Sequence, residues 1–175
     1  MKIIRSTLFL FAAALLFLVR PEPAQSAMPR AAALAKAPAF SGVALDGRAI
    51  SSAALAGKPY IVNFFASWCP PCRHEIPDMV ALQKKYAAKG FTFIGVAVSD
   101  SEPSIRAFAA KAGINYPVMM GDDKVIGAFS GHVRGGIRSI PTSFVVNSRG
   151  EITEVITGAR SLEAFEEKIG NAFGR

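Results

Sequence analysis

The stretch VNFFASWCPPC, residues 62–72, holds both cysteines of the 175-residue chain, Cys69 and Cys72. It begins inside a continuous apolar run, PYIVNFF at residues 59–65. Such a run is typical of a strand that is buried on both faces of a sheet. Because proline has a φ angle suited to the first turn of a helix, we expect a helix to begin at Cys69 or Pro70. The two thiols are therefore predicted where a buried strand is followed by a helix.

Two cysteines separated by two residues are compatible with a metal site, a structural disulfide or a redox couple. A structural zinc site needs about four ligands, and the only histidines of the chain are His74 and His132. His74 is two residues after Cys72, a poor helical position for joining the pair. A disulfide that closes so short a loop adds only roughly 2 kcal/mol of stability. We therefore favour a redox couple over the other two interpretations.

The expected helix start gives the two cysteines different roles. The partial positive charge of a helix N-terminus favours thiolate over thiol and makes Cys69 the nucleophile. Cys72, one turn further in, is expected to be more buried and to resolve the mixed disulfide that Cys69 forms. Pro70 and Pro71 have no N–H, so only the amide of Cys72 is placed to donate to the Cys69 sulfur. We predict a modestly lowered pKa for the Cys69 thiol and a reducing rather than an oxidising couple.

The rest of the chain alternates strand and helix patterns, which is typical of an α/β domain with a mixed sheet covered on both faces. An Asp46-Gly47 turn between two short extended pieces predicts a hairpin before the first buried strand. Ser101 and Ser161 are suitable helix caps, and Gly113 is a suitable helix end. We predict strands at 91–98 and 116–120, helices at 101–113, 123–129 and 161–172, a glycine-rich loop at 130–139, and an antiparallel hairpin at 142–147 and 151–157.

The N-terminus has the pattern of a secretory signal peptide. Two basic residues precede an uninterrupted apolar run at residues 6–19, and small residues follow it. The run of 14 residues is shorter than the roughly 20 needed to cross a bilayer comfortably. We predict a signal peptide at 1–26, with an uncleaved membrane anchor through residues 6–19 as the alternative, a linker at 27–38 and a domain at 39–175.

The formal net charge is +7, and it falls to +5 when residues 1–26, with three basic and one acidic residue, are removed. A basic balance of this size is compatible with acidic partners. However, the chain has no Lys/Arg cluster and no interleaving of basic with aromatic residues that would indicate a nucleic-acid interface. We favour a solvated basic surface. The loop at 130–139, with His132, Arg134 and Arg138, is expected near the active site, where it would select partners.

A second stretch, SIPTSFVVNSRGEI at residues 139–152, completes a resemblance to the thioredoxin fold. Residues 40–172 resemble the TlpA/ResA-like family of exported thiol–disulfide oxidoreductases. The resemblance implies a thioredoxin-like α/β fold with a central mixed sheet flanked by helices, to which the N-terminal hairpin is an extension. It also implies that a cis bond precedes Pro141, that this proline lies against the cysteine pair, and that the Ile140 backbone binds an extended substrate. Trp68 is expected to shield the disulfide.

One position departs from ordinary thioredoxins, which carry a buried aspartate six residues before the first cysteine. Here that position is Asn63, which cannot titrate. Glu75 lies three residues after Cys72, on the same helical face, and the TlpA/ResA-like branch resembles this chain at both positions. If Glu75 is partly buried, its pKa rises toward neutrality and it can exchange the proton of Cys72. The alternative is a solvated glutamate favoured by the helix dipole.

These patterns predict an exported protein disulfide reductase of the periplasm, soluble or anchored to the inner membrane. It would use the Cys69–Cys72 couple, with no other cofactor and no metal, and we expect a monomer. The resemblance implies a membrane electron donor of the DsbD/CcdA kind, and client proteins such as apocytochrome c and copper-site assembly proteins. The alternatives are a disulfide-donating oxidase and a copper-binding assembly chaperone.

Overall fold

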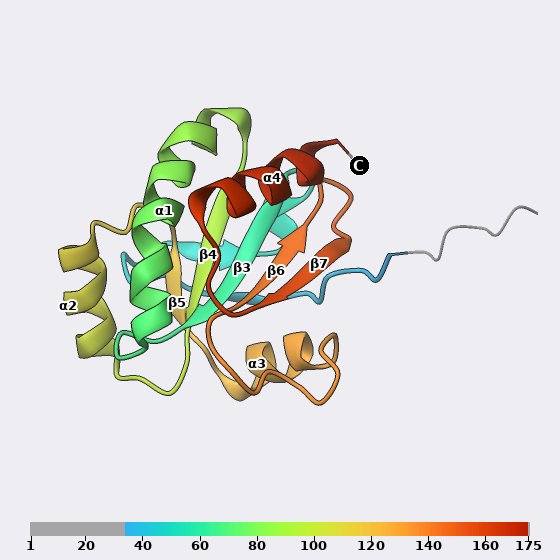
Figure 1. Ribbon diagram of the computed structural model, residues 1–175. Helices are drawn as coiled ribbons and strands as arrows, with labels where there is room; N and C mark the ends of the chain where they lie inside the picture. Colours follow the sequence, from blue (N-terminus) through green and yellow to red (C-terminus); the bar gives the residue numbers. More distant parts are fainter. Residues whose placement is uncertain (1–33, 175) are drawn as a thin grey trace, which may run out of the picture. The chain divides into compact units, whose positions relative to one another are not determined.

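The central element of the fold is a five-stranded sheet in the order β5-β4-β3-β6-β7 (Figure 1). The structure is a computed structural model, and it describes residues 34–174. Strand β3 lies in the middle, parallel to β4 and antiparallel to β6. The predicted mixed sheet is therefore confirmed. Its strands are β3 (Tyr60–Phe65), β4 (Thr92–Ala97), β5 (Val118–Met120), β6 (Thr142–Val146) and β7 (Ile152–Thr157).

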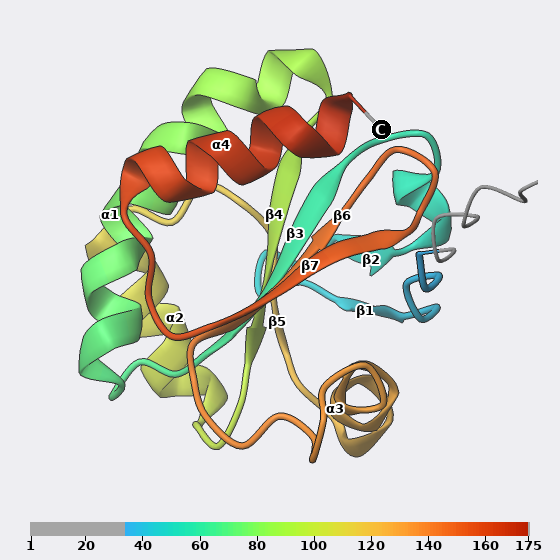
Figure 2. The ribbon, with the colours of Figure 1, turned by 45° about the vertical axis from the view of Figure 1, so that its right-hand side comes forward.

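Helices cover both faces of this sheet. α1 and α4 lie next to each other on one face, and α3 lies on the opposite side (Figures 1 and 2). Ile61 and Phe65 of β3 pack with the α1, α2 and α4 layer, whereas Val62 and Phe64 pack with the α3 layer. Because both faces of β3 are covered, all its residues except Asn63 carry large, mostly apolar side chains. The helices are α1 (Pro70–Tyr86), continued by a 3-10 turn at Ala87–Lys89, α2 (Glu102–Ala112), α3 (Asp123–Ser130) and α4 (Leu162–Phe173).

The predicted N-terminal hairpin is confirmed and joins one edge of the sheet. Strands β1 (Ser41–Val43) and β2 (Ala49–Ser51) pair antiparallel, and a 3-10 turn at Ala53–Leu55 follows them. The N–H of Leu45 donates to the carbonyl of Val118 at 2.7 Å, which attaches the hairpin to β5.

Residues 35–37 are attached to the other edge of the sheet. Ala37 N–H donates to the carbonyl of Gly150 at 2.9 Å, and Ile152 N–H donates to that of Ala35 at 2.8 Å. The predicted signal peptide and residues 27–33 of the predicted linker lie outside the described residues. Within residues 34–174, no helix combines the length and hydropathy that crossing a membrane requires.

The topology gathers five loops at one end of the sheet. β3 and β4 are parallel and end there at Phe65 and Ala97, while the antiparallel β6 begins there, with Thr142 paired to Phe64. β7 also ends there, because Thr157 pairs with Thr142. β5 ends there too, because it is parallel to β4 and Met120 pairs with Ala97. The loops that adjoin these strand ends include residues 66–69, 98–101, 121–122, 131–141 and 158–161. Both cysteines lie at this end.

Gly95 in β4 is expected to be intolerant of any side chain. A Cβ atom built there would lie 2.9 Å from Phe65 Cε1 and 3.0 Å from Val118 Cγ2, both inside the packed core. We expect Gly95→Ala to lower the free energy of unfolding by roughly 1–3 kcal/mol, because overpacking forces neighbours out of their rotamers. Chemical denaturation measures this. Gly127→Ala is the control: it meets nothing within 4 Å in α3, so it should gain about 0.5–1 kcal/mol instead.

Candidate active site

Cys69 is the N-cap residue of α1, and its sulfur accepts a hydrogen bond from the N–H of Cys72 at 3.3 Å. A disulfide joins the two residues, whose Cα atoms are 5.3 Å apart. Pro70 and Pro71 occupy the first two helical positions between them. The prediction that a single amide donates to the Cys69 sulfur from this turn is confirmed. Both residues are buried in the disulfide form, Cys72 fully and Cys69 with 3% of its surface exposed.

The segment before β6 lies against the cysteine pair. The Ile140–Pro141 peptide bond is cis, and the carbonyl oxygen of Ile140 lies 3.7 Å from Cys69 Sγ. Thr142 Oγ1 donates to the carbonyl of Ser139 at 2.7 Å, which ties the segment together. The sequence segments around Cys69 and Pro141, about 70 residues apart, thus meet at one site.

Glu75 lies in a buried polar cluster on the inner side of α1. Only 1% of its surface is exposed. Asn63 Nδ2 donates to Glu75 Oε1 at 2.9 Å, and the backbone N–H of Arg160 donates to Oε2 at 3.2 Å. Asn63 Nδ2 also donates to Ser143 Oγ at 2.9 Å. The alternative of a solvated glutamate is therefore wrong, and Asn63 serves as a donor to the carboxyl group.

The burial of Glu75 changes its protonation. Removal from water raises the pKa of the carboxyl to about 7, although the hydrogen bonds from Asn63 and from the Arg160 backbone act in the opposite direction. A group with such a pKa is partly protonated and partly ionised near neutral pH. It can therefore accept or release a proton under the conditions in which thiols react. Its action on Cys72 stays a prediction.

Trp68 lies at the surface beside Cys69, with 57% of its area exposed. Its Nε1 donates to the carbonyl of Ser99 at 2.9 Å, which fixes the orientation of the ring. In the same loops, the N–H of Ser67 donates to Asp100 Oδ2 at 2.7 Å. The ring thus offers apolar surface at the edge of the site.

Three contributors to the site were missed by sequence reasoning: Ser143, Asp100 and the backbone of Arg160. Ser143 contacts Asn63 because the two residues are opposite each other in the β3–β6 register. No local pattern in the sequence indicates such a register. The Asp100 side chain accepts from a backbone N–H of another loop, and Arg160 donates through its own backbone N–H. Residue types alone indicate neither contact.

Adding an amide in the first turn of α1 is expected to change the redox chemistry. Pro71→Ala supplies an N–H at the second helical position, where an N-cap side chain also finds donors. We expect a lower pKa for the Cys69 thiol and a higher reduction potential, because the thiolate gains a second donor. Thiol alkylation against pH and equilibration with glutathione measure the two quantities. Pro103→Ala is the matched control, since Pro103 lies in the first turn of α2 below a serine cap; an equal shift there would contradict the argument.

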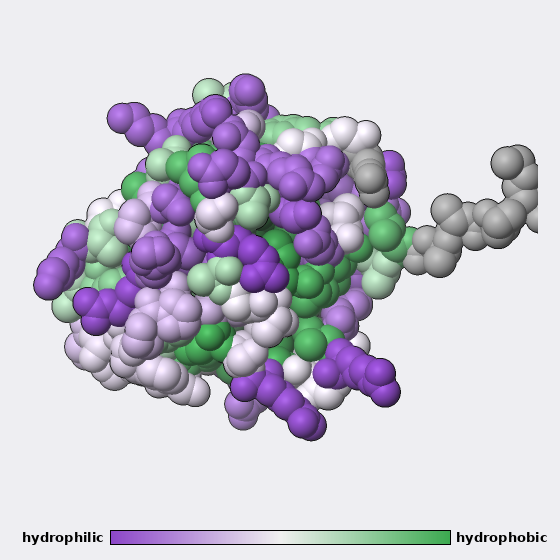
Figure 3. All heavy atoms as spheres, viewed as in Figure 1, coloured by the Kyte–Doolittle hydropathy of each residue, from purple (hydrophilic) through white to green (hydrophobic). Residues whose placement is uncertain are grey.

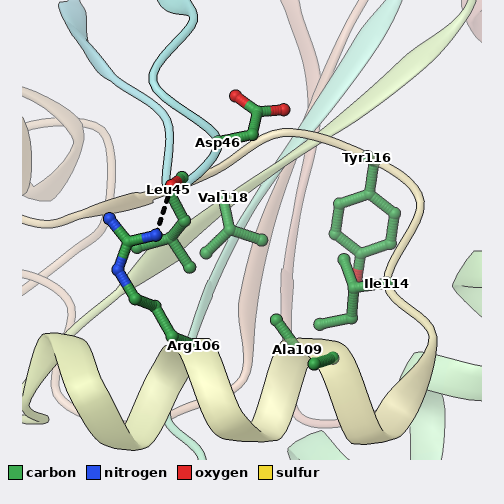
Figure 4. Close-up of a pocket in the computed structure, with 8 residues that line it drawn as sticks. Leu45, Asp46, Arg106, Ala109, Ile114, Tyr116 and Val118 are labelled. Carbon is green, nitrogen blue, oxygen red and sulfur yellow. Dashed lines mark hydrogen bonds between the residues drawn. The ribbon is translucent and has the colours of Figure 1, made fainter.

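A separate pocket lies between the N-terminal hairpin and α2 (Figure 4). Its lining includes Leu45, Tyr116 and Arg106 but none of the residues of the cysteine site. Its charged groups already have partners: Arg106 donates to the carbonyl of Leu45 and pairs with Glu102, and Asp46 pairs with Arg48. Across residues 34–174, no three His, Cys, Asp or Glu side chains gather as metal ligands. The cysteine pair is the candidate reactive centre.

Comparisons of the sequence and of the structure both find similarity to proteins of thiol–disulfide exchange. The sequence matches the Redoxin family over residues 32–172. It is 32% identical over 123 residues to "Thiol-disulfide oxidoreductase ResA" from Halalkalibacterium halodurans, covering 70% of this chain and 67% of that protein. A crystal structure of a thioredoxin-family thiol:disulfide interchange protein from Chlorobium tepidum TLS has 52% identity and a TM-score of 0.80, covering 82% of this chain and 99% of that one. A putative thiol:disulfide interchange protein DsbE from Chlorobium tepidum has 29% identity and a TM-score of 0.71, covering 81% and 97%.

Proposed function

Because the chain belongs to the Redoxin family and is a thiol–disulfide oxidoreductase of the ResA type, we propose that it acts outside the cytoplasm as a protein disulfide reductase. The first turn of α1 is the observation that supports reduction, and not oxidation, of client proteins. The Cys69 sulfur receives one amide hydrogen bond from that turn, at 3.3 Å, and two prolines withhold the others. A thiolate with few donors is weakly stabilised, so the dithiol readily gives up its electrons.

The proposed reaction consists of two thiol–disulfide exchanges. The Cys69 thiolate attacks one sulfur of a client disulfide, and the other client sulfur leaves as a thiolate. Cys72 then gives its proton to the carboxylate of Glu75 and attacks the Cys69 sulfur, which releases the second client sulfur. Two electrons pass from the Cys69–Cys72 dithiol to the client, and the disulfide remains in the protein.

The surroundings of the pair support these steps. Cys72 is fully buried and lies one turn after Cys69 in α1, so it is placed to attack the mixed disulfide from within the protein. Ile140 offers its backbone carbonyl next to Cys69, at 3.7 Å from the sulfur, where an extended client segment would pair with it. Trp68 would contact the client beside the reacting sulfurs, and Pro141 holds the segment against the pair.

Our proposal places the protein in the periplasm, as an exported chain that is soluble or anchored through residues 6–19. An oxidising compartment does not supply electrons, so a membrane donor of the DsbD/CcdA kind would reduce the pair again. The proposed clients are apocytochrome c and the copper-site thiols of assembly proteins. A disulfide-donating oxidase is the competing function, and the reduction potential separates the two.

Trapping in cells tests this proposal. Cells that make the full chain with Cys72→Ser are quenched with acid and a thiol-blocking reagent, and proteins attached to Cys69 are identified by mass spectrometry. We expect exported proteins with cysteine pairs, attached through those cysteines, and none on the Cys69→Ser chain. Attachment to cytoplasmic proteins alone, or no attachment, would contradict the proposal.

A further inference from the structure

Three of the loops around the cysteine pair contain basic residues and no acidic ones. Residues 66–74, 130–142 and 157–162 contain four arginines, two histidines and no acidic residue. The four arginines, here called the cationic rim, are Arg73, Arg134, Arg138 and Arg160, and all four are exposed. In the orientation of Figure 1, long hydrophilic side chains project from the lower edge of the molecule, where α3 and the loop after it lie (Figure 3).

The cationic rim holds a large share of the basic residues of the domain. Residues 34–174 hold 15 Lys and Arg and 12 Asp and Glu, a net charge of +3. The rim holds four of the 15 basic residues and none of the 12 acidic ones. The remainder of the domain, with 11 basic and 12 acidic residues, therefore has a net charge of −1. Two further loops at this end contain Asp100 and Asp122, so the loops of the end together hold four basic and two acidic residues, a net charge of +2.

Ion pairing also distinguishes the four arginines of the cationic rim from the other basic residues. Within residues 34–174, six of the 11 basic residues outside the rim form ion pairs, and none of the four in the rim does. Arg138 and Arg160 instead donate to backbone carbonyls of their own loops, Gly135 at 2.7 Å and Ala159 at 2.9 Å. These bonds hold the two guanidinium groups in place without neutralising their charge.

Several acidic groups near the site are buried or already accept hydrogen bonds. Glu75 is buried. The Asp100 carboxylate accepts from the N–H groups of Ser67 and Ser101, at 2.7 and 2.8 Å. Glu102 pairs with Arg106 on α2. Asp122 and Asp123 lie at the same end of the sheet, after β5 and two strands away from β3, where Asp122 caps α3 and accepts from the N–H of Val125 at 2.7 Å.

An apolar contact point completes the surface. The Trp68 ring is 57% exposed and fixed by its bond to Ser99. A surface pocket lined by Pro70, Arg73 and His74 lies next to it in sequence, at the start of α1. Exposed aromatic residues and arginines are both enriched in protein interfaces, and this end of the molecule offers both.

We propose that the cationic rim and Trp68 form a docking surface for client segments in which acidic residues flank the disulfide. This inference rests on the proposed reductase function and specifies its substrate class. The four unpaired charges attract such a segment over a distance of about a Debye length and orient its disulfide toward Cys69. The contribution is to the rate of encounter more than to the strength of a final complex.

Three synthetic peptides test the inference. They share one intramolecular disulfide and differ only in the flanking residues, which are aspartate, asparagine or lysine. The rate constant for oxidation of the reduced full chain is followed through the fluorescence of Trp68, the one tryptophan present. At about 10 mM salt we expect the aspartate peptide to react at least about tenfold faster than the lysine peptide. At about 500 mM salt the difference should fall below about twofold.

Charge variants locate the effect. Arg134→Glu with Arg138→Glu should lower the ratio of the aspartate to the lysine rate constant about tenfold at low salt, whereas Arg134→Lys with Arg138→Lys should keep it. Lys84→Glu with Lys111→Glu is the matched control, because both lysines are exposed in the last turns of α1 and α2. Those turns lie at the other end of the sheet. This double variant changes the net charge by the same amount as Arg134→Glu with Arg138→Glu.

The outcomes separate the inference from the function on which it rests. Equal rates for the aspartate and lysine peptides at low salt would overturn the docking surface, and so would an equal loss of preference in the Lys84/Lys111 control. In either case, reaction of the asparagine peptide leaves the reductase function standing. If no peptide disulfide is reduced at all, the proposed function fails and the inference fails with it.

Discussion

Replacing Cys69 by serine is expected to lower the rate of disulfide reduction more than about a thousandfold, because the hydroxyl that remains is a far weaker nucleophile than a thiolate. Cys69 is the N-cap of α1 and the sulfur that receives the Cys72 amide. Replacing Cys72 by serine should leave the first attack in place and remove the second. A stable mixed disulfide with one client molecule per chain should then accumulate.

The two variants are compared with bis(2-hydroxyethyl) disulfide, a small neutral substrate, so that differences in client docking do not contribute. Mass spectrometry measures the adduct on Cys72→Ser, and turnover with a reductant measures the rate on Cys69→Ser. If the adduct formed on Cys72 of the Cys69→Ser chain and did not form on Cys69 of the Cys72→Ser chain, Cys72 would be the nucleophile and Cys69 the resolving residue. Retained turnover in Cys69→Ser would contradict the mechanism altogether.

The stability of the oxidised protein is expected to fall by about 3 kcal/mol between about pH 4.5 and pH 7, because of Glu75. Burial raises the pKa of this carboxyl to about 7, against an ordinary value of 4.5. Between these two pH values the folded chain holds a proton that the unfolded chain has released. The free energy of unfolding therefore has its full contribution from Glu75 below pH 4.5 and loses it as the pH rises through 7.

Denaturant unfolding of the disulfide form at several pH values measures this slope. Glu75→Gln should flatten it, and Glu167→Gln, at an exposed position of α4, should not. The slopes are compared and not the absolute stabilities, because Asn63 and the Arg160 amide both donate to the carboxyl. A glutamine offers only one acceptor to these two donors. An unchanged slope in Glu75→Gln would show that Glu75 does not titrate in this range.

The same substitution tests the proposed proton transfer. With Glu75→Gln, release of the client from the mixed disulfide should slow and lose its dependence on pH near 7, since Cys72 has no carboxylate to take its proton. The first attack by Cys69 should change less. Stopped-flow measurement of the two phases separates these steps.

Much of the fold is predictable because its signals are local. The cap at Ser101, the end at Gly113 and the cap at Ser161 were predicted from single residue types, and the structure has each of them at the bounds of α2 and α4. The two prolines after Cys69 gave the start of α1 in the same way. An apolar run such as residues 59–65 also predicts its own burial.

The rest of the site depends on contacts between distant residues. Asn63 was predicted to lack a titrating role, but its bond to Ser143, 80 residues away, follows only from the register of β3 and β6. The bond from Arg160 to Glu75 spans 85 residues. The net charge of the whole chain predicts only a solvated basic surface. The gathering of Arg73, Arg134, Arg138 and Arg160 at one end becomes visible only when the topology brings three separate loops together.

The reduction potential of the Cys69–Cys72 couple tests the central claim most directly. The full chain is equilibrated with thiol–disulfide buffers of known potential, and Trp68 fluorescence or alkylation of the free thiols measures the reduced fraction. A reductase with one amide donor at its nucleophilic sulfur should have a potential near that of thioredoxin, about −270 mV. A value near that of the disulfide donor DsbA, about −120 mV, would contradict the account and make the protein an oxidase.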